Sequence, residues 1–424
     1  MTESTAKLVR TVGFWGLVAM CINAVVGSGV FLLPHESFVL LGPFSLWAPL
    51  LFAVPVFILV LCFAEAASHF SEPGGAYLYA RTAFGDFIGF ETGWMNWIAR
   101  LTSLASLSNG MVLTLAKFNP ALKDTAPRMI IITAIILILG AIHFFGVKYG
   151  AASIYIFTWG KLLPLLLFIV VALVVWKHNP IPGSFTLPGP GTKWNDAALF
   201  MLFAYAGFEN LGVPAGEYKN PRKDLPGALL IGILAIAAIY VFAQLAAMSA
   251  LPDLSISDAP IATAAGALVG PIGVLIVSIG ALLSMAGTNS GTMLEGSRML
   301  YALSLDRNMG PIRFVHPRFH TPSVAIVIHS VAALALALSG SFAQLALLSA
   351  VARLSTYLFT ATAIPFLNKS PEKRVRTIIL SILGTLVALA FVVTLDKFKL
   401  VAAAIALVVG GVIYLVTRLG VRRR

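Results

Sequence analysis

Long apolar segments separated by short polar stretches make up most of this 424-residue chain. A helix needs about 17 to 25 mainly apolar residues to cross a lipid bilayer. Segments of that kind lie near residues 13–34, 43–67, 88–116, 129–146, 152–176, 196–215, 226–250, 270–303, 322–340, 342–367, 374–394 and 396–418. The pattern predicts an all-α polytopic membrane protein with twelve transmembrane helices. No stretch between the spans has room for a soluble domain.

The first span is interrupted near its middle by Gly27, Ser28 and Gly29. An unpaired backbone N–H or C=O in hydrocarbon costs several kcal/mol, so lipid-exposed helices rarely break. A break is tolerated where the freed groups line an enclosed cavity or hold a ligand, which makes this motif a candidate binding site at the membrane midplane. The alternative is close helix packing, because small residues at short spacing are common in membrane helices.

A second disturbance lies in the sixth span, where Gly207, Glu209 and Asn210 follow an apolar run. Spans one and six occupy corresponding positions if spans one to five and six to ten are two copies of one five-helix unit. Paired interruptions in such positions are the best pointer in a sequence to a transport site. The pair therefore favours a binding role for both breaks.

Composition and charge agree with a membrane protein. Charged residues make up 11% of the chain and hydrophobic residues 59%, whereas soluble domains carry about 25% charged residues. If the loops alternate between the two sides, most of the 29 lysines and arginines lie on the side that holds both termini. The positive-inside rule then makes both termini cytoplasmic. The net charge of +12 is explained by this topology and by attraction to anionic lipid, so no nucleic-acid partner is needed.

Several chemistries have no support in the sequence. The two cysteines, Cys21 and Cys62, lie inside apolar spans and provide neither a disulfide framework nor a zinc site. No phosphate-binding GxxxxGK[ST] motif occurs, which argues against ATP-driven transport. No catalytic cluster and no set of ligands at metal spacing is found. We therefore expect neither an enzyme nor a bound cofactor or metal.

Four segments together resemble the amino acid–polyamine–organocation superfamily. They are GSGVFLLP at 27–34, GGAYLYARTAFGDFIGFETGW at 74–94, GFEN at 207–210 followed by EYKNPRKDLP, and SRMLYALSLDRNMGP at 297–311. The resemblance implies a leucine-transporter-type fold, a 5+5 inverted repeat with two peripheral helices, that moves amino acids or related amines by alternating access. The implied organisation is a cytoplasmic tail (1–12), a first repeat (13–176), an extracytoplasmic loop (177–195), an inverted second repeat (196–367), two peripheral helices (368–418) and a basic cytoplasmic tail (419–424).

The two breaks offer complementary groups for an amino acid zwitterion. A carboxylate would bind at the start of the second half-helix, where backbone N–H groups are free and the helix dipole is favourable. An ammonium group would bind backbone carbonyls left free where the first half-helix ends and in span six. The carboxylate site is expected at Gly27, Ser28, Gly29 and Val30, and the ammonium site at Val25, Phe203, Ala206 and Gly207. Phe203 also falls where the superfamily often has an aromatic gate, and Tyr205 is either a gate or a packing residue.

Lys161 lies well inside span five, where an unpaired ammonium is costly and is a functional candidate by default. It resembles the lysine that sodium-independent members of the superfamily carry in place of a bound cation. By that resemblance it would bridge the first half-helix, near Asn23, to hydroxyls of span eight. Ser284 and Thr288, spaced i and i+4, share one face of that span. Transport would be proton-coupled if this lysine changes protonation, and facilitative or by exchange if it stays charged.

Other charges also lie deep in the spans. Arg100 and, one turn later, position 104 (Leu104) are expected to face the substrate from span three, and Arg353 lies in span ten. A guanidinium here could bind the side chain of an acidic amino acid. The alternative is internal pairing with Glu209, which needs a partner and is also a candidate proton-linked group. Glu295 is expected to pair with Arg298 on its own helix.

These expectations define a sodium-independent secondary transporter of amino acids in the cytoplasmic membrane, working by proton coupling or by exchange. A polyamine or amine exchanger is the nearest alternative, although the deep arginines disfavour it. An ion or solute channel is the alternative from a different class. The sequence does not specify the amino acid, the direction of transport or the oligomeric state.

Overall fold

The computed structural model describes residues 12–71, 74–146, 151–175, 181–213, 215, 218–307, 309–368 and 370–422. Throughout these ranges the chain forms helices and short turns, with one isolated bridge between Val12 and Tyr218 and no sheet. The helices are α1 (Phe14–Val25), α2 (Gly29–Leu41), α3 (Ala48–Ala67), α4 (Ala76–Phe84), α5 (Asp86–Leu115), α6 (Thr125–Phe144), α7 (Ala151–Val175), α8 (Trp194–Tyr205), α9 (Pro221–Ala250), α10 (Pro260–Val269), α11 (Pro271–Arg307), α12 (Ser323–Ser339), α13 (Phe342–Leu367), α14 (Arg374–Val393) and α15 (Lys397–Arg422). The predicted all-α class is confirmed.

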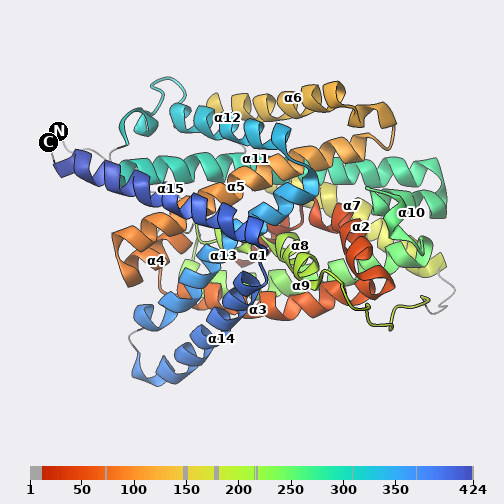
Figure 1. Cartoon of the computed structure of the whole chain (residues 1–424), viewed down its shortest axis with the longest axis horizontal. Helices are drawn as coiled ribbons and strands as arrows, with labels where there is room; N and C mark the ends of the chain where they lie inside the picture. Colours follow the sequence, from red (N-terminus) through yellow and green to blue (C-terminus); the bar gives the residue numbers. More distant parts are fainter. Residues whose placement is uncertain are drawn as a thin grey trace.

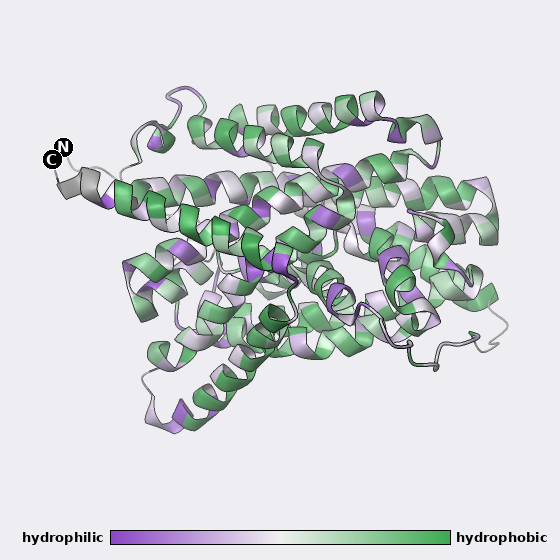
Figure 2. Cartoon of the chain, viewed as in Figure 1, coloured by the Kyte–Doolittle hydropathy of each residue, from purple (hydrophilic) through white to green (hydrophobic). Residues whose placement is uncertain are grey.

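Eight helical segments of the described chain are long and apolar enough to cross a membrane. They are Gly29–Ala67, Thr125–Phe144, Thr158–Val175, Pro221–Ala250, Pro271–Leu305, Phe342–Leu367, Pro371–Val393 and Lys397–Arg418. Helices α1, α10 and α12 are apolar but shorter. Figure 2 shows that hydrophobic residues dominate the outer helices, whereas hydrophilic residues gather at helix ends and near the centre. This distribution suits a molecule surrounded by lipid.

Helix α5 is the central element of the fold. It passes through the middle of the molecule beside α11 and also packs against α12, α13 and α15 (Figure 1). Glu91, Arg100 and Ser103 are all buried on it. Charged side chains at membrane depth are tolerated when they face the protein interior. The central position of α5 thus explains how a long helix can carry many buried polar residues.

The first predicted span is interrupted at its glycine–serine motif. Helix α1 ends at Val25, residues 26–28 are not helical, and α2 starts at Gly29. Ser28 precedes α2 without forming a side-chain cap, so its hydroxyl is not used to close the helix end. The interruption therefore leaves polar groups near the centre of the fold.

The sixth predicted span is also interrupted, next to the Gly207 at which the sequence predicts a break. Helix α8 stops at Tyr205, Ala206 is extended, and Gly207 has φ +129°, a conformation that L side chains rarely adopt. A three-residue 3-10 turn, η3 (Phe208–Asn210), follows the break within the predicted span 196–215. Glu209 accepts a hydrogen bond of 2.8 Å from the backbone N–H of Gly207, which fixes the turn.

The two breaks meet through their backbones. A Cβ atom added to Gly207 would lie 2.5 Å from the carbonyl oxygen of Ala24, at the end of α1. A Cβ added to Gly29 would lie 2.9 Å from Cα of Ala204, on α8. Both distances are shorter than real Cβ contacts allow, so only glycine permits this approach. The two interrupted segments consequently form one continuous junction.

Two short helices were not predicted. Helix α4 follows Gly74 and Gly75, between the second and third predicted spans, and α10 precedes the eighth predicted span. Gly270, with φ +68°, separates α10 from α11. Ten apolar residues are too few to cross a bilayer, so the length criterion did not identify α10. The predicted tail segments 1–11 and 423–424 lie outside the described residues.

Candidate binding site between the helix breaks

A cavity of about 220 Å³ lies where the two breaks meet. Its walls come from α1, α5, α8, α11 and α13 and from the two interruptions. Predicted site residues that line it are Asn23, Val25, Gly27, Ser28, Gly29, Arg100, Phe203, Ala206, Gly207, Thr288 and Arg353, and Glu295, for which no binding role was predicted, lines it as well. The folded chain thus brings residues from both predicted repeats to one enclosed space.

The start of α2 presents unused donors to this cavity. The first backbone N–H groups of a helix have no partner within the helix, and the positive end of its dipole lies there. Ser28 is 1% exposed, and its hydroxyl has no hydrogen-bond partner among the described residues. The side-chain oxygen of Asn23 is likewise buried without a partner in the described chain. Buried polar atoms are rarely left unpaired, so these atoms mark a place for a polar ligand.

Val25 and Phe203, which also line the cavity, supply backbone carbonyls at the junction. The Val25 carbonyl is contacted at 3.4 Å by the hydroxyl of Tyr240, which donates a shorter bond of 2.8 Å to Ala204. The Phe203 carbonyl accepts a bond of 3.2 Å from the Ala206 amide. A carbonyl oxygen has two lone pairs, so each can accept a further bond from a ligand. Donors and acceptors therefore face one cavity from different helices.

Lys161 on α7 lies behind the first break rather than in the cavity. Its side chain is fully buried, and Nζ donates to the carbonyl oxygens of Asn23 at 2.9 Å and Val26 at 2.7 Å. The Thr288 hydroxyl is 3.5 Å from the same nitrogen. Ser284 donates to the Val26 and Gly27 carbonyls at 3.0 and 3.1 Å. Carbonyls left free at the end of α1 are thus satisfied by side chains of α7 and α11.

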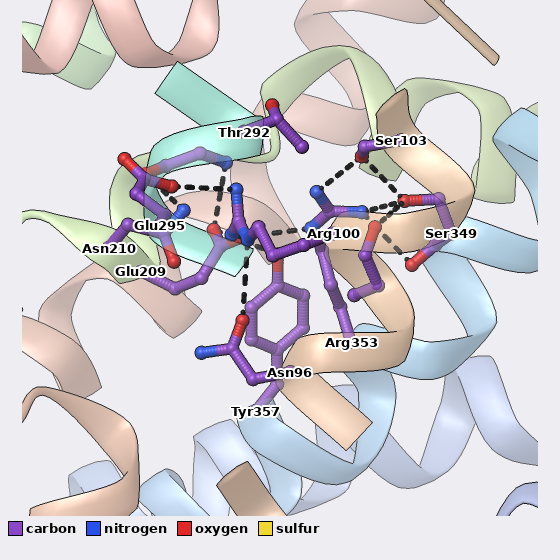
Figure 3. A network of polar contacts seen from close by, with 12 residues as sticks. Asn96, Arg100, Ser103, Glu209, Asn210, Thr292, Glu295, Ser349, Arg353 and Tyr357 are labelled. Atoms are coloured by element: carbon purple, nitrogen blue, oxygen red, sulfur yellow. Dashed lines mark hydrogen bonds and ion pairs between the residues drawn. The ribbon is translucent and has the colours of Figure 1, made fainter. Parts of the chain in front are cut away.

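A buried charge cluster lies beside the second break (Figure 3). Oε1 of Glu209 is 2.8 Å from Nη2 of Arg100 and 2.8 Å from Nε of Arg353. All three side chains are at most 5% exposed. Both arginines therefore share the carboxylate of Glu209. This internal pairing is the alternative that the sequence offered to binding the side chain of an acidic amino acid.

The remaining arginine donors are also engaged. Nη2 of Arg353 donates to the Ser103 hydroxyl at 2.9 Å, and Nη1 donates to the Ser349 carbonyl at 3.0 Å. Nη1 of Arg100 lies 3.2 Å from Oε2 of Glu295, the residue for which the sequence suggested Arg298 as partner. This ion pair joins α5 to α11.

Some predicted site residues lie outside the cavity wall. Val30 and Ser284 are buried behind it, and Glu209 reaches it only through the arginines. The Tyr205 hydroxyl donates to the Pro49 carbonyl at 2.8 Å, so this side chain is used in packing. Position 104 was a wrong choice, because Leu104 is a fully buried leucine in the apolar core. The polar side chain that lines the cavity is its neighbour Ser103.

Sequence reasoning also missed several residues of the cavity wall. Ser103 follows Arg100 by three residues and Thr292 follows Thr288 by four, so both could have been identified from helical spacing. Asn210 was noted as part of the second break, but it was not proposed as a residue of the site. Met20 and Tyr218 also line the cavity. Neither has a local signal that distinguishes it from ordinary core residues.

An aromatic pair separates this cavity from a second one. Phe203 lines the first cavity and packs edge-on against Phe342, with ring centroids 6.4 Å apart. Phe342 lines a second cavity of about 490 Å³, together with Lys123, Arg128 and Asp258. Phe203 therefore stands between two hollow regions, the position that a gate would occupy.

Replacing Gly207 with alanine should destabilise the protein by about 1–3 kcal/mol, the cost of a strained backbone conformation or an overpacked site. The added Cβ would meet the Ala24 carbonyl, and φ +129° disfavours any side chain. Thermal unfolding of the purified protein in detergent measures the effect. Gly189→Ala is the control, because a Cβ at Gly189 meets no atom within 4 Å. Equal Tm values for both variants would contradict the close approach.

Comparison with known proteins gives consistent matches over most of the chain. A family model described as amino acid permease matches residues 12–416. The chain is 32% identical to the serine/threonine exchanger SteT of Bacillus subtilis, over 75% of this chain and 74% of SteT. It is 27% identical to the branched-chain amino acid permease BcaP of the same organism, over 97% of this chain and 94% of BcaP. An uncharacterized transporter of Mycobacterium bovis is 28% identical over 85% of the chain and 81% of its own length.

Proposed function

Because this chain belongs to the amino acid permease family, we propose that it is a secondary transporter that moves an amino acid across the cytoplasmic membrane by alternating access. The family consists of membrane transporters, so the protein is not an enzyme. The observation that carries the proposal is the junction of two broken helices around one small cavity. Its volume of about 220 Å³ is below the ~300–1,000 Å³ of sites for drug-sized ligands and suits a single amino acid.

The polar groups of the junction support the orientation of the substrate. The α-carboxylate accepts bonds from the free N–H groups at Ser28, Gly29 and Val30, and from the unpaired Ser28 hydroxyl. The α-ammonium donates to carbonyl oxygens such as those of Val25 and Phe203. The side chain then extends toward α5 and α13, where Ser103 and the charge cluster lie. Phe203 covers the site on the side of the second cavity.

The architecture in this proposal has twelve spans arranged as a 5+5 inverted repeat. The first repeat, 13–176, contains α1/α2, α3, α5, α6 and α7, and the second, 196–367, contains α8/η3, α9, α11, α12 and α13. Helices α14 and α15 are peripheral. The two breaks then occupy corresponding positions, as expected for a site at a repeat interface. The positive-inside rule places both termini in the cytoplasm.

The contacts of Lys161 support sodium-independent transport. Its ammonium occupies the space between backbone carbonyls of Asn23 and Val26 and the hydroxyl of Thr288. Oxygen atoms of these kinds are the ligands that a sodium ion would require. A fixed cation at this position removes the need for the metal ion. Exchange of one amino acid for another is favoured over proton coupling, because the similar SteT is an exchanger.

Reconstitution of the purified protein in liposomes tests this function directly. We expect saturable uptake of a radiolabelled amino acid from a panel, faster with internal amino acid than without, and unchanged when potassium replaces sodium. Stimulation by a pH gradient in empty liposomes would favour proton coupling. Flux that does not saturate and shows no counterflow would favour a channel, and competition by polyamines alone would favour the amine exchanger. Failure to transport any amino acid would refute the proposal.

A further inference from the structure

The two carboxylates of the buried charge cluster differ in how firmly they are held (Figure 3). The Glu209 side chain is 0% exposed, and its oxygens accept bonds from Arg100, Arg353 and the Gly207 amide. These contacts come from α5, α13 and the second break, so Glu209 is fixed by the fold.

Glu295 is the loosely held member. Its side chain is 31% exposed, it lines the cavity, and its carboxylate lies 3.2 Å from Nη1 of Arg100. Arg100 itself is 5% exposed. A partly exposed carboxylate with a long contact can leave its partner at lower cost than one buried among several donors. The contact between Glu295 and Arg100 is therefore the one part of the described cluster that a ligand in the cavity could replace.

The charges of the cluster balance only when Glu295 is included. Arg100 and Arg353 contribute two positive charges, while Glu209 and Glu295 contribute two negative charges. An anionic substrate side chain would add a second carboxylate beside Glu295 in a poorly solvated space. Like charges placed together disfavour binding, and a site can discriminate against a ligand in this way. Without Glu295, Arg100 would offer a free donor and the cluster would carry one uncompensated positive charge.

We propose that Glu295 determines the charge selectivity of this transporter by occupying the place on Arg100 that an acidic substrate side chain would otherwise take. The wild-type protein then carries amino acids with uncharged side chains and rejects aspartate and glutamate. This inference rests on the proposed transport function. It also explains how two buried arginines can border the site of a carrier for neutral substrates.

The test is the variant Glu295→Gln, which keeps the shape of the side chain and removes its charge. In proteoliposomes, the inhibition constants of aspartate and glutamate against a neutral amino acid should fall at least about tenfold, the scale of close charge-pair effects. The KM for the neutral substrate should change by a clearly smaller factor than these inhibition constants, because its contacts at the helix breaks are retained. Competition by lysine should not increase, since the variant loses a negative charge.

Controls separate this inference from the transport function itself. Glu372→Gln removes an equal charge from an exposed position and should leave all constants unchanged. If Glu295→Gln does not cycle, the shift of Tm caused by added aspartate still reports binding to the purified variant. Efficient wild-type transport of aspartate, an unchanged preference in Glu295→Gln, or an equal gain for every substrate would each overturn the inference. Absence of all amino acid transport by the wild type would instead refute the proposed function.

Discussion

Replacing Lys161 with methionine should lower the exchange rate in proteoliposomes by at least about 100-fold, the scale expected when a residue orients substrate-binding groups. The substitution keeps most of the apolar volume but removes the ammonium that binds the carbonyls of Asn23 and Val26. Each buried acceptor that loses its donor costs about 1–3 kcal/mol. The end of α1 would therefore relax, and the donors at the start of α2 would no longer be held for a carboxylate.

The experiment compares initial rates at equal amounts of folded protein. Lys193→Met, which alters an exposed lysine outside the helices, serves as the control and should transport normally. A thermal unfolding measurement on both variants separates a loss of folding from a loss of transport. Wild-type exchange by Lys161→Met would show that this lysine does not support the break.

Replacing Glu209 with glutamine should have the largest effect on stability. Arg100 and Arg353, both at most 5% exposed, would lose the carboxylate that they share. Removing one partner of a buried ion pair costs about 3–5 kcal/mol, because an uncompensated charge remains in a low-dielectric environment. The fall in Tm of the detergent-purified protein, or the loss of folded protein on expression, measures this cost.

A double variant gives a stricter test of the same cluster. Adding Arg353→Met to Glu209→Gln removes one of the two unpaired charges, so the combined loss should be smaller than the sum of the single losses. Coupling between residues in contact is about 0.5–3 kcal/mol. Strictly additive losses would mean that the two side chains do not interact as the 2.8 Å contact indicates.

The sequence allowed the polar contacts of Lys161 to be predicted because a buried ammonium has few solutions. Only backbone groups freed by a helix break and nearby hydroxyls could satisfy it within an apolar span. The resemblance to sodium-independent members of the superfamily suggested hydroxyls of span eight as partners, and the i, i+4 spacing then selected Ser284 and Thr288, whose side chains both lie at the first break. The glycines of the two interruptions were found for the same reason, since polar and flexible residues are rare inside spans.

Contacts between side chains on different helices could not be predicted in this way. Spacing along one helix suggested Arg298 for Glu295, whereas the contact to Arg100 depends on how α5 and α11 are packed. The choice of Leu104 over Ser103 shows the same limit, because positions i+3 and i+4 from Arg100 lie on similar faces. Helix rotation decides which of them lines the cavity, and rotation is set by the neighbouring helices. The break at Gly207 was predicted, but its φ of +129° and its close approach to Ala24 depend on the packing of the two segments.

The backbone contact between the two breaks has a mechanical consequence. Gly207 and Ala24 approach with no side chain between them, so a displacement of one segment cannot be absorbed by a change of rotamer. Packed elements of this kind shift between discrete arrangements rather than deforming continuously. In the proposed alternating-access cycle, a displacement of α1 would therefore require a matching displacement of α8. The glycines would then serve both the proposed binding site and the movement that opens and closes it.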